Sequence, residues 1–285
     1  MIAQRLALSY WPCPPGIPAG EMSSPPARRD AAPSGPPAFR DRAEAGVRLG
    51  AALREVLGDA RPYDPERSRA NAGPSAVTVA PGVVRPVVFA IPRGGVAVGV
   101  GVARALSARL DVLMVRKIGH PAAPELGLGA IAEDGAGGAA EPYFDAEMLS
   151  RVGLTRDDLA GVVARERAEL ARRVALYRRG PSARAGALGS VIVVDDGLAT
   201  GVTARAALRA VLERGAARPV LAVPVAAAAA VDAVLGAIAK ENGEVVTLVT
   251  PRRFRSVGEW YADFGQLTDA DVLALLRPRA GDGAP

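Results

Sequence analysis

A buried strand followed by two carboxylates and a short polar loop constrains this chain more than any other stretch of its sequence. Residues 191–194 read Val-Ile-Val-Val. Such an unbroken β-branched run is typical of a strand buried on both faces of a parallel sheet. Asp195 and Asp196 follow directly, and a loop of small and hydroxyl residues then leads into a helix. Ligands of open α/β sheets bind at the carboxyl ends of strands, so we expect a site at this junction.

The loop at residues 197–203 suits a phosphate. Its small residues leave backbone N–H groups accessible, Thr200 and Thr203 supply hydroxyls, and a helix N-terminus follows. The charges of Asp195 and Asp196 repel a phosphate, so these residues are expected to accept hydrogen bonds from hydroxyls or to hold a cation nearby. A ligand with a terminal phosphate and a neighbouring diol, such as a ribose 5-phosphate, meets both demands.

Short apolar strands alternate with helices along the rest of the chain, which predicts βαβ units and a parallel sheet. The predicted strands cover residues 87–91, 110–115, 191–194, 219–223 and 245–249, and the predicted helices cover 39–57, 96–107, 155–179, 226–240 and 268–276. The helix after the polar loop is expected to be capped by Thr200 or Thr203 and to end at Gly215. Residues 118–140 are glycine-rich without a regular pattern and are predicted to form a long mobile loop.

The composition excludes several classes of function. Hydrophobic residues make up 49% of the chain but aromatic residues only 4%, and the net charge is +5. The arginines are dispersed without an aromatic platform, which argues against nucleic acid as a partner. The single Cys13 and the single His120 exclude a disulfide framework and a cysteine-based zinc cluster. No apolar run is long enough to span a membrane, and we expect a cytoplasmic protein without a membrane partner.

The N-terminal region differs from the rest of the chain. Residues 1–37 are rich in proline with little patterned hydrophobicity, which predicts a disordered extension before a domain at residues 38–280. Met22 is a candidate for the true start. Residues 58–84 are irregular and are interpreted as an insertion.

The stretch from Val191 to Thr203 resembles the phosphoribosyl-pyrophosphate (PRPP) signature of the type I phosphoribosyltransferases. That signature is an apolar strand, two acidic residues, two or three small residues and then Thr-Gly-x-Thr, and every position is filled here. The resemblance covers residues 39–276. It implies an α/β fold with a parallel sheet flanked by helices and a small hood segment. It also implies a 5-phosphate site at Gly197, Ala199, Thr200, Gly201 and Thr203, with Asp195 and Asp196 as catalytic residues that bind the ribose hydroxyls.

A second βα junction offers a site for pyrophosphate. Arg93, Gly94 and Gly95 follow the first core strand and open a helix, where adjacent glycines admit a phosphate and the helix terminus favours an anion. The type I enzymes bind pyrophosphate at this point of their topology. As an isolated sequence, the same residues would form an ordinary turn.

Two cations precede the glycine-rich loop. Arg116 and Lys117 would neutralise the diphosphate leaving group, and a basic pair at this place resembles that of adenine phosphoribosyltransferases. We therefore assign both to pyrophosphate binding, with Lys117 also catalytic; a solvated strand end is the alternative. The loop would be a lid that excludes water. His120, Glu125 and Glu133 lie within it without an assigned role.

The segment from Pro251 to Phe264 is similar to the hood of 6-oxopurine phosphoribosyltransferases. By this resemblance Trp260 or Tyr261 would stack on the acceptor, and Asp263 would join Asp195 and Asp196 near the metal. The spacing and the paired Trp-Tyr depart from that family, so the identity of the base does not carry over. An aromatic cluster that anchors the last helix is an equally good interpretation.

These pieces together match a group of bacterial predicted phosphoribosyltransferases. The resemblance implies transfer of ribose 5-phosphate from PRPP to a nucleobase or similar acceptor, with release of pyrophosphate, Mg²⁺ as cofactor and a homodimeric assembly. The first alternative is a regulatory protein that binds PRPP or a nucleotide without transfer. The second is an enzyme whose acceptor is an amine or a modified sugar. A nucleotide-binding dehydrogenase is disfavoured because the Gly-x-Gly-x-x-Gly fingerprint is missing after the first strand.

Overall fold

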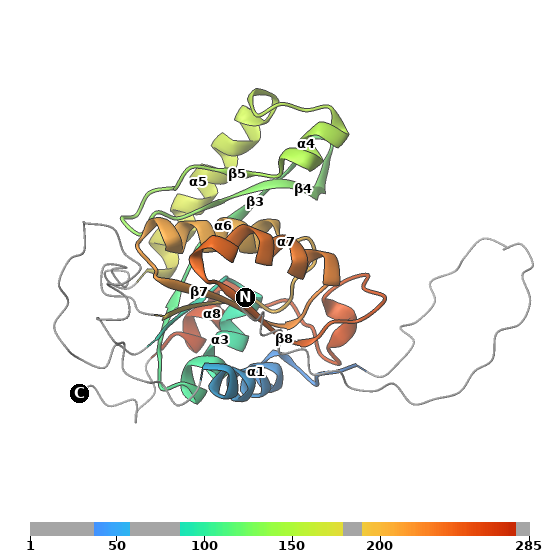
Figure 1. The fold of residues 1–285 in the computed structure, drawn as a ribbon. Helices are drawn as coiled ribbons and strands as arrows, with labels where there is room; N and C mark the ends of the chain where they lie inside the picture. The colour runs from blue at the N-terminus through green and yellow to red at the C-terminus, as the bar shows by residue number, and fades with distance from the viewer. Residues whose placement is uncertain (1–36, 58–85, 179–189, 278–285) are drawn as a thin grey trace, which may run out of the picture.

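A five-stranded sheet runs through the residues that the computed structural model describes, which are 37–57, 86–178 and 190–277 (Figure 1). Its strand order is β2-β1-β6-β7-β8, and all neighbouring strands are parallel. The strands are β1 (Val87–Ala90), β2 (Arg109–Val112), β6 (Ser190–Val194), β7 (Arg218–Val225) and β8 (Glu244–Val249). This sheet, alternating with helices along the chain, confirms the predicted fold class.

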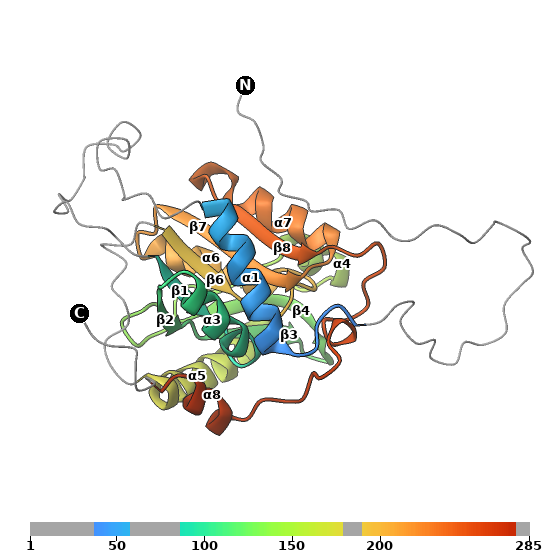
Figure 2. The ribbon, with the colours of Figure 1, turned by 90° about the horizontal axis from the view of Figure 1, so that it is seen from below.

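Helices cover both faces of the parallel sheet (Figures 1 and 2). Ile192 packs in one apolar cluster with Leu49 of α1, whereas Val193 packs in another with Leu208 of α6. Successive side chains of a strand point to opposite faces, so burial on both faces explains the unbroken apolar run of β6. The flanking helices are α1 (Arg42–Leu57) and α3 (Gly94–Ala105) on one face, and α6 (Val202–Glu213) and α7 (Ala228–Ile238) on the other.

Residues 118–140 form most of an antiparallel sheet, so the prediction of a long mobile loop was wrong. β3 pairs with β4, and β4 pairs with β5. The predicted strand at 110–115 is also divided, because β2 of the parallel sheet and β3 of the antiparallel sheet are separate strands. The three antiparallel strands are β3 (Val115–His120), β4 (Ala123–Ala132) and β5 (Tyr143–Phe144).

The glycines of this region allow strands to approach closely. A Cβ atom on Gly119 would overlap the carbonyl of Pro124, and one on Gly129 would overlap the carbonyl of Tyr143. Both residues therefore permit pairing where any larger side chain would separate the strands. A glycine-rich sequence indicates flexibility only when the backbone is free, and here the backbone is paired.

The antiparallel strands and the two helices that follow them form what we call the antiparallel subdomain, residues 115–177. It lies against α6 of the core (Figure 1). An ion pair of 2.5 Å joins Arg205 of α6 to Asp145, which also caps α4. Glu133, only 1% exposed, pairs with Arg178 and lies 4.0 Å from Arg214 at the end of α6. The helices of the subdomain are α4 (Ala146–Val152) and α5 (Ala160–Tyr177).

The C-terminal region agrees with the sequence prediction. After a single turn, η4 (Gly258–Trp260), the chain ends its described part with α8 (Asp269–Leu275). Thr268 caps α8 in a capping box with Asp271, as its position predicts. The other predicted helices also occur, with ends within a few residues of those expected.

Several predictions lie outside the described residues. These are the disorder of the N-terminal extension, apart from its last residue, the start at Met22 and the irregular insertion at 58–84. Among the described residues, no helix is both long enough and apolar enough to cross a membrane.

Candidate active site

The two junctions predicted to bind ligand lie side by side. β1 and β6 are neighbours in the sheet, and the chain leaves β1 toward β2 on the opposite side, so the strand order reverses between them. Such a switch point is where open α/β sheets bind ligands. The Ile91 N–H donates to the carbonyl of Val194 over 2.9 Å, which ties the two strand ends together. The structure thus brings the two predicted loops to one place.

Gly94 and Gly95 are required by this close approach. A Cβ atom on Gly94 would overlap the carboxylate of Asp196. One on Gly95 would lie 2.6 Å from the carbonyl oxygen of Val194 and 2.9 Å from Cα of Asp195. The sequence predicts that these glycines leave room for a phosphate. The structure shows that the space a side chain would take is occupied by the neighbouring loop at residues 194–196.

Asp195 and Asp196 have different surroundings. The Asp195 carboxylate accepts from the Asp196 N–H over 2.8 Å, so it braces its own loop. Burial of the Asp195 carboxyl, and then the charge of Asp196, raise the pKa of Asp195 well above its ordinary value. Asp196 forms an ion pair with Arg42 of α1, with 2.8 Å between Nε and Oδ2. Asp196 is therefore the carboxylate with a cation beside it.

The loop predicted to bind a phosphate ends at an uncapped helix. Gly201, at the N-cap of α6, adopts a left-handed conformation with φ of +78°, and no side chain caps the helix. The prediction that Thr200 or Thr203 caps α6 was therefore wrong. Ala199 and Thr200 are exposed. The first N–H groups of α6 carry no side-chain cap, which suits an anion. At its other end, α6 stops before Gly215, whose φ of +88° confirms the predicted terminus.

Arg93 lies at the N-cap of α3, beside the paired glycines. Its guanidinium is 3.8 Å from Asp269 of α8, and its side chain is 37% exposed. A long, partly exposed pair of this kind contributes little to stability. Arg93 is thus placed where a diphosphate would meet it, and only weakly held.

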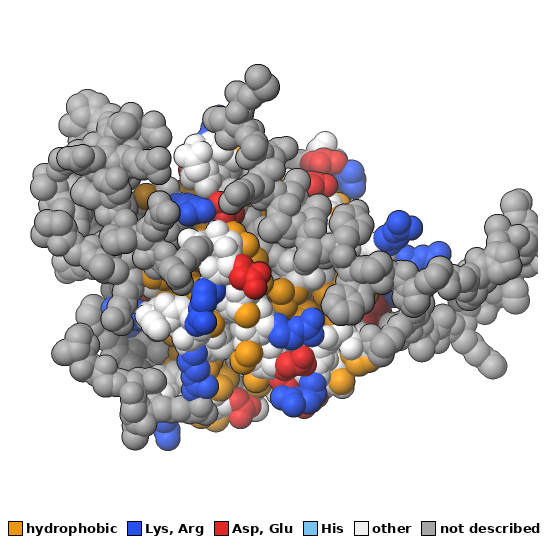
Figure 3. Space-filling model, turned by 60° about the horizontal axis from the view of Figure 1, so that its bottom comes forward, with side chains coloured by type: hydrophobic (Ala, Val, Ile, Leu, Met, Phe, Trp, Pro, Cys, Tyr) orange, Lys and Arg blue, Asp and Glu red, His pale blue; other side chains and the backbone are white. Residues whose placement is uncertain are grey.

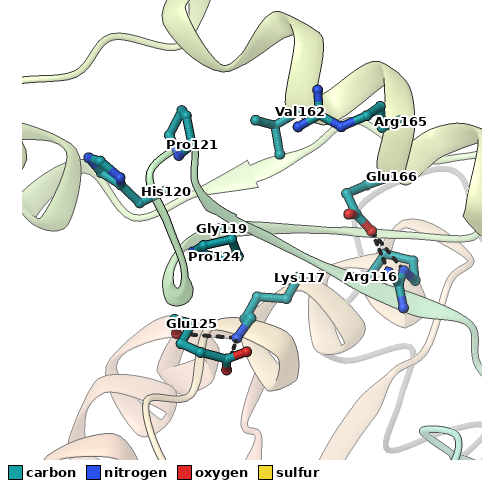
Figure 4. Close-up of a pocket in the computed structure, with 10 residues that line it drawn as sticks. All are labelled: Arg116, Lys117, Gly119, His120, Pro121, Pro124, Glu125, Val162, Arg165 and Glu166. Atoms are coloured by element: carbon teal, nitrogen blue, oxygen red, sulfur yellow. Dashed lines mark hydrogen bonds and ion pairs between the residues drawn. The ribbon is translucent and has the colours of Figure 1, made fainter.

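Arg116 and Lys117 do not act as a pair in this structure. They are neighbours on β3, so their side chains point to opposite faces, as Figure 4 shows. Arg116 bonds Glu166 of α5 at 2.7 Å, whereas Lys117 pairs with the fully exposed Glu125 at 3.1 Å. Only Lys117 lies on the face that carries Val115, a residue packed with the start of α6.

A cavity of about 330 Å³ lies between the β3–β4 hairpin and α5 (Figure 4). Arg116, Lys117, Arg165 and His120 line it together with the carboxylates of Glu125 and Glu166. The ring nitrogen Nδ1 of His120 accepts from the Ala122 N–H over 3.0 Å, so His120 shapes the hairpin turn.

The C-terminal aromatic segment lies against the signature loop. The Tyr261 hydroxyl donates to the Asp196 carbonyl over 2.6 Å, and a Cβ atom on Gly197 would lie 2.5 Å from Val257. Tyr261 is 5% exposed, and burial raises its pKa. Its ring packs between those of Phe39 and Phe264.

The two aromatic candidates for acceptor stacking therefore differ. Both rings belong to one cluster, but Trp260 is half-buried whereas Tyr261 is enclosed. Trp260 is the better placed of the two to offer a ring face. The cluster anchors the segment before the last helix on Phe39 and Val225, whereas α8 itself packs through Val272 in a different apolar cluster.

The residues predicted to hold a metal do not form a protein-only site. Within the described part of the chain, no three side chains of His, Cys, Asp or Glu are grouped as metal ligands. Asp263 is exposed, and its carboxylate accepts from the Gly265 N–H over 3.0 Å. Asp196 is already paired with Arg42. These side chains do not by themselves fit a Mg²⁺ site.

Arg42 and Tyr261 both contact Asp196, although neither belongs to the stretch from Val191 to Thr203. Neither contact was predicted from the sequence. Arg42 begins α1 after the N-terminal extension, 154 positions before its partner Asp196. No local pattern marks an arginine at the first position of a helix as part of a distant site. The role of the Tyr261 hydroxyl likewise depends on tertiary packing.

Two βα junctions, one of them with paired carboxylates before an uncapped helix, thus meet at the switch point of a parallel sheet. A family model, described as the phosphoribosyl transferase domain, matches residues 82–239, more than half of the chain. The chain therefore belongs to this family.

Named relatives agree with that assignment. Proteins from two strains of Mycobacterium tuberculosis, named provisionally as phosphoribosyl transferases, are 40% identical over 191 residues. The match covers 67% of this chain and 41% of theirs, so this chain spans about two fifths of the length of these curated relatives. The crystal structure of TT1426 from Thermus thermophilus is similar, with a TM-score of 0.60 and 38% identity. That comparison covers 84% of this chain and 97% of TT1426.

Proposed function

We propose that this protein transfers ribose 5-phosphate from PRPP to a nucleobase or a similar acceptor and releases pyrophosphate. The observation that carries the proposal is the meeting of two βα junctions at the switch point of the sheet. One supplies Asp195, Asp196 and the uncapped start of α6, and the other supplies Gly94 and Gly95. Membership of the phosphoribosyl transferase family supports it.

In the proposed complex the ligand spans both junctions. The 5-phosphate would accept from the N–H groups of the loop 197–203 and from the hydroxyls of Thr200 and Thr203. Asp196 would accept hydrogen bonds from the ribose hydroxyls, while Asp195 braces the loop. At the second junction, the guanidinium of Arg93 and the backbone N–H groups of Gly94 and Gly95 would hold the diphosphate.

The reaction breaks the bond between the anomeric carbon and the diphosphate oxygen, and both electrons leave with pyrophosphate. The acceptor atom forms the new bond at that carbon and loses a proton. Positive charge develops on the ribose ring before attack, so fixed negative charge nearby stabilises the transition state. Holding the sugar and the leaving group in place contributes the rest.

Mg²⁺ enters this proposal with the substrate. The described carboxylates do not group into a metal site, so we expect the diphosphate oxygens to supply most of the ligands. The comparison of PRPP affinity with and without Mg²⁺ tests this. Asp263→Asn, which would change the Mg²⁺ requirement if Asp263 contributes a ligand, tests the predicted metal residue. The homodimer and the cytoplasmic location remain predictions.

Pyrophosphate release from PRPP and Mg²⁺, measured across a panel of purines, pyrimidines and amines, tests the function. One acceptor should trigger release, and Asp196→Asn should abolish it while Glu125→Gln, at a fully exposed carboxylate of the hairpin, should not. PRPP binding without release for any acceptor would favour the regulatory alternative. The absence of both binding and release would overturn the proposal.

On the described face shown in Figure 3, basic and acidic side chains lie interspersed among apolar ones. A nucleic-acid site would instead gather basic side chains without acidic ones between them. The prediction that nucleic acid is not a partner concerns the whole surface and remains a prediction.

A further inference from the structure

Arg42 makes three distinct contacts at the edge of the candidate site. Its Nε donates to Oδ2 of Asp196 over 2.8 Å, and one terminal nitrogen donates to the Gly265 carbonyl over 2.9 Å. The guanidinium carbon lies 3.8 Å from the centre of the Phe264 ring. The side chain is only 12% exposed. A planar group bonded on two edges and stacked on a face is held in one orientation.

The fold positions Arg42 through close helix packing. α1 lies directly on α3, and a Cβ atom on Gly101 of α3 would lie 2.5 Å from the backbone of Gly46. The contact brings the start of α1 over the start of α3, where Gly94 lies. A Cβ atom on Gly94 would lie 3.1 Å from Nε of Arg42. Arg42 is therefore beside both ligand junctions.

The residues just before α1 pair with a segment that is remote in sequence, and this pairing fixes the N-terminal end of α1. The Phe39 N–H donates to the Trp260 carbonyl, and the Ala262 N–H donates back to the Phe39 carbonyl, over 3.0 and 2.8 Å. This short pairing joins residues 39–40 to residues 260–263. As a result, Arg42 and Tyr261 both contact Asp196 in the loop after β6. Both segments lie outside the residues that the family model matches.

The positive charge of Arg42 offsets the repulsion between the two adjacent carboxylates. Asp195 and Asp196 are adjacent in a partly buried loop, where two negative charges repel each other. Among the described residues, Arg42 is the cation that forms an ion pair with either of them. The titratable groups that face Asp195 are the carboxylate of Asp196 in its own loop, the guanidinium of Arg42 from α1 and the neutral phenol of Tyr261 after η4.

We propose that Arg42 is a positioning residue of the PRPP site, which holds the Asp196 carboxylate in the orientation that accepts the ribose hydroxyls. This inference rests on the proposed function. The ion pair uses Oδ2 of Asp196, so Oδ1 is the oxygen that would face the sugar. Arg42 acts through Asp196 and contacts no reacting atom.

Calorimetric titration with PRPP and Mg²⁺ tests the proposal on three variants. Arg42→Met should weaken PRPP binding about tenfold or more, because Asp196 loses a charged hydrogen bond. Arg42→Lys should recover part of the affinity, since lysine keeps the positive charge but lacks the planar guanidinium that bonds Asp196 and Gly265 together. Arg48→Met is the matched control: Arg48 lies on the same helix and stacks on Phe39 of the same aromatic cluster, away from Asp196. It should bind PRPP like the parent.

A second readout is rescue by the conservative variant. If the contacts of Arg42 are merely structural, a folded Arg42→Met binds PRPP like the parent. The positioning role instead predicts that its affinity falls and that Arg42→Lys restores part of it, with thermal melts showing that both variants are folded.

The two possible failures are distinguishable. If the parent binds PRPP and Arg42→Met binds it equally well or more tightly, the positioning role is wrong while the proposed function stands. If the parent does not bind PRPP, the proposed function fails first. Should Arg42→Met not fold, Arg42→Gln carries the same comparison, and parent-like affinity in that folded variant would overturn the role.

Discussion

The parallel sheet and the antiparallel subdomain are encoded in opposite ways. The strands β1 and β6 lie about a hundred positions apart in the chain, yet each is an apolar run that the sequence marks clearly. β3 and β4 are joined by a tight turn, yet their polar and glycine residues give no strand pattern that can be recognised in the sequence. The comparison teaches that a strand is visible in sequence when it is buried on both faces, whatever the distance to its partner.

The two regions are also held together differently. Packed aliphatic side chains unite the sheet with its helices. The antiparallel subdomain is joined to α6 partly by buried ion pairs, among them Asp145 with Arg205 and Glu133 with Arg214. Charged groups buried in this way are costly to leave without a partner.

The largest effect on stability should come from Glu133→Ala. Glu133 is 1% exposed, and its loss leaves Arg178 and Arg214 without their carboxylate. Breaking a buried pair costs about 3–5 kcal/mol, which chemical denaturation would measure. Glu125→Gln in the same hairpin removes a fully exposed carboxylate and should leave stability unchanged. Equal stability of the two variants would show that the subdomain does not depend on its buried ion pairs.

Gly95→Ala should disturb the core junction instead. The added Cβ would lie 2.6 Å from the Val194 carbonyl oxygen, and overpacking of this kind costs about 1–3 kcal/mol. PRPP binding should weaken as well, because the two loops are pushed apart. Gly236→Ala in α7 is the control, since nothing lies within 4 Å of its Cβ position, and it should be neutral or stabilising. A fully stable, fully binding Gly95→Ala would contradict the close approach described above.

Arg116 and Lys117 lie on opposite faces of β3, and we expect Arg116 to contribute to stability and Lys117 to ligand binding. Arg116→Met removes a partly buried pair with Glu166 and should cost about 1 kcal/mol. Lys117→Met should leave the melting temperature unchanged but weaken pyrophosphate binding, measured by calorimetry. The reverse pattern, with Arg116 needed for pyrophosphate and Lys117 for stability, would refute the assignment of the two faces.

The smallest effect is a dependence on pH at Asp195. Burial and the charge of Asp196 raise its folded pKa, so the folded chain keeps the proton to higher pH than the unfolded chain does. The stability of the parent should therefore decline as pH rises from the unfolded pKa toward the raised folded value. Asp195→Asn has no such proton, so thermal melts should show its stability relative to the parent growing with pH. A difference that shrinks as pH rises would mean that the pKa is lowered instead.

Much of the core site was predictable because its information is local. The run from Val191 to Thr203 contains its own strand, carboxylates and loop, and the glycines at 94 and 95 follow their own strand. The helix cap was not predictable in this way. Thr200 and Thr203 suit a cap by residue type, but Gly201 takes the N-cap position with a left-handed backbone.

The rest of the site depends on contacts between distant segments. Arg42 reaches Asp196 only because α1 packs on α3 and because the residues before it pair with residues 260–263. The hairpin containing Lys117 was missed because Gly119 and Gly129 suggest freedom where they permit close pairing. Tertiary packing in both cases decides what local sequence leaves open.

If the proposed function is right, the loop after β6 binds PRPP through Asp196. Calorimetric titration of the parent and of Asp196→Asn with PRPP and Mg²⁺ tests it most directly, with a thermal melt of each protein to confirm folding. We expect that the parent binds and that the variant, still folded, loses at least about tenfold in affinity. Equal binding by a folded Asp196→Asn, or no binding by the parent, would contradict it.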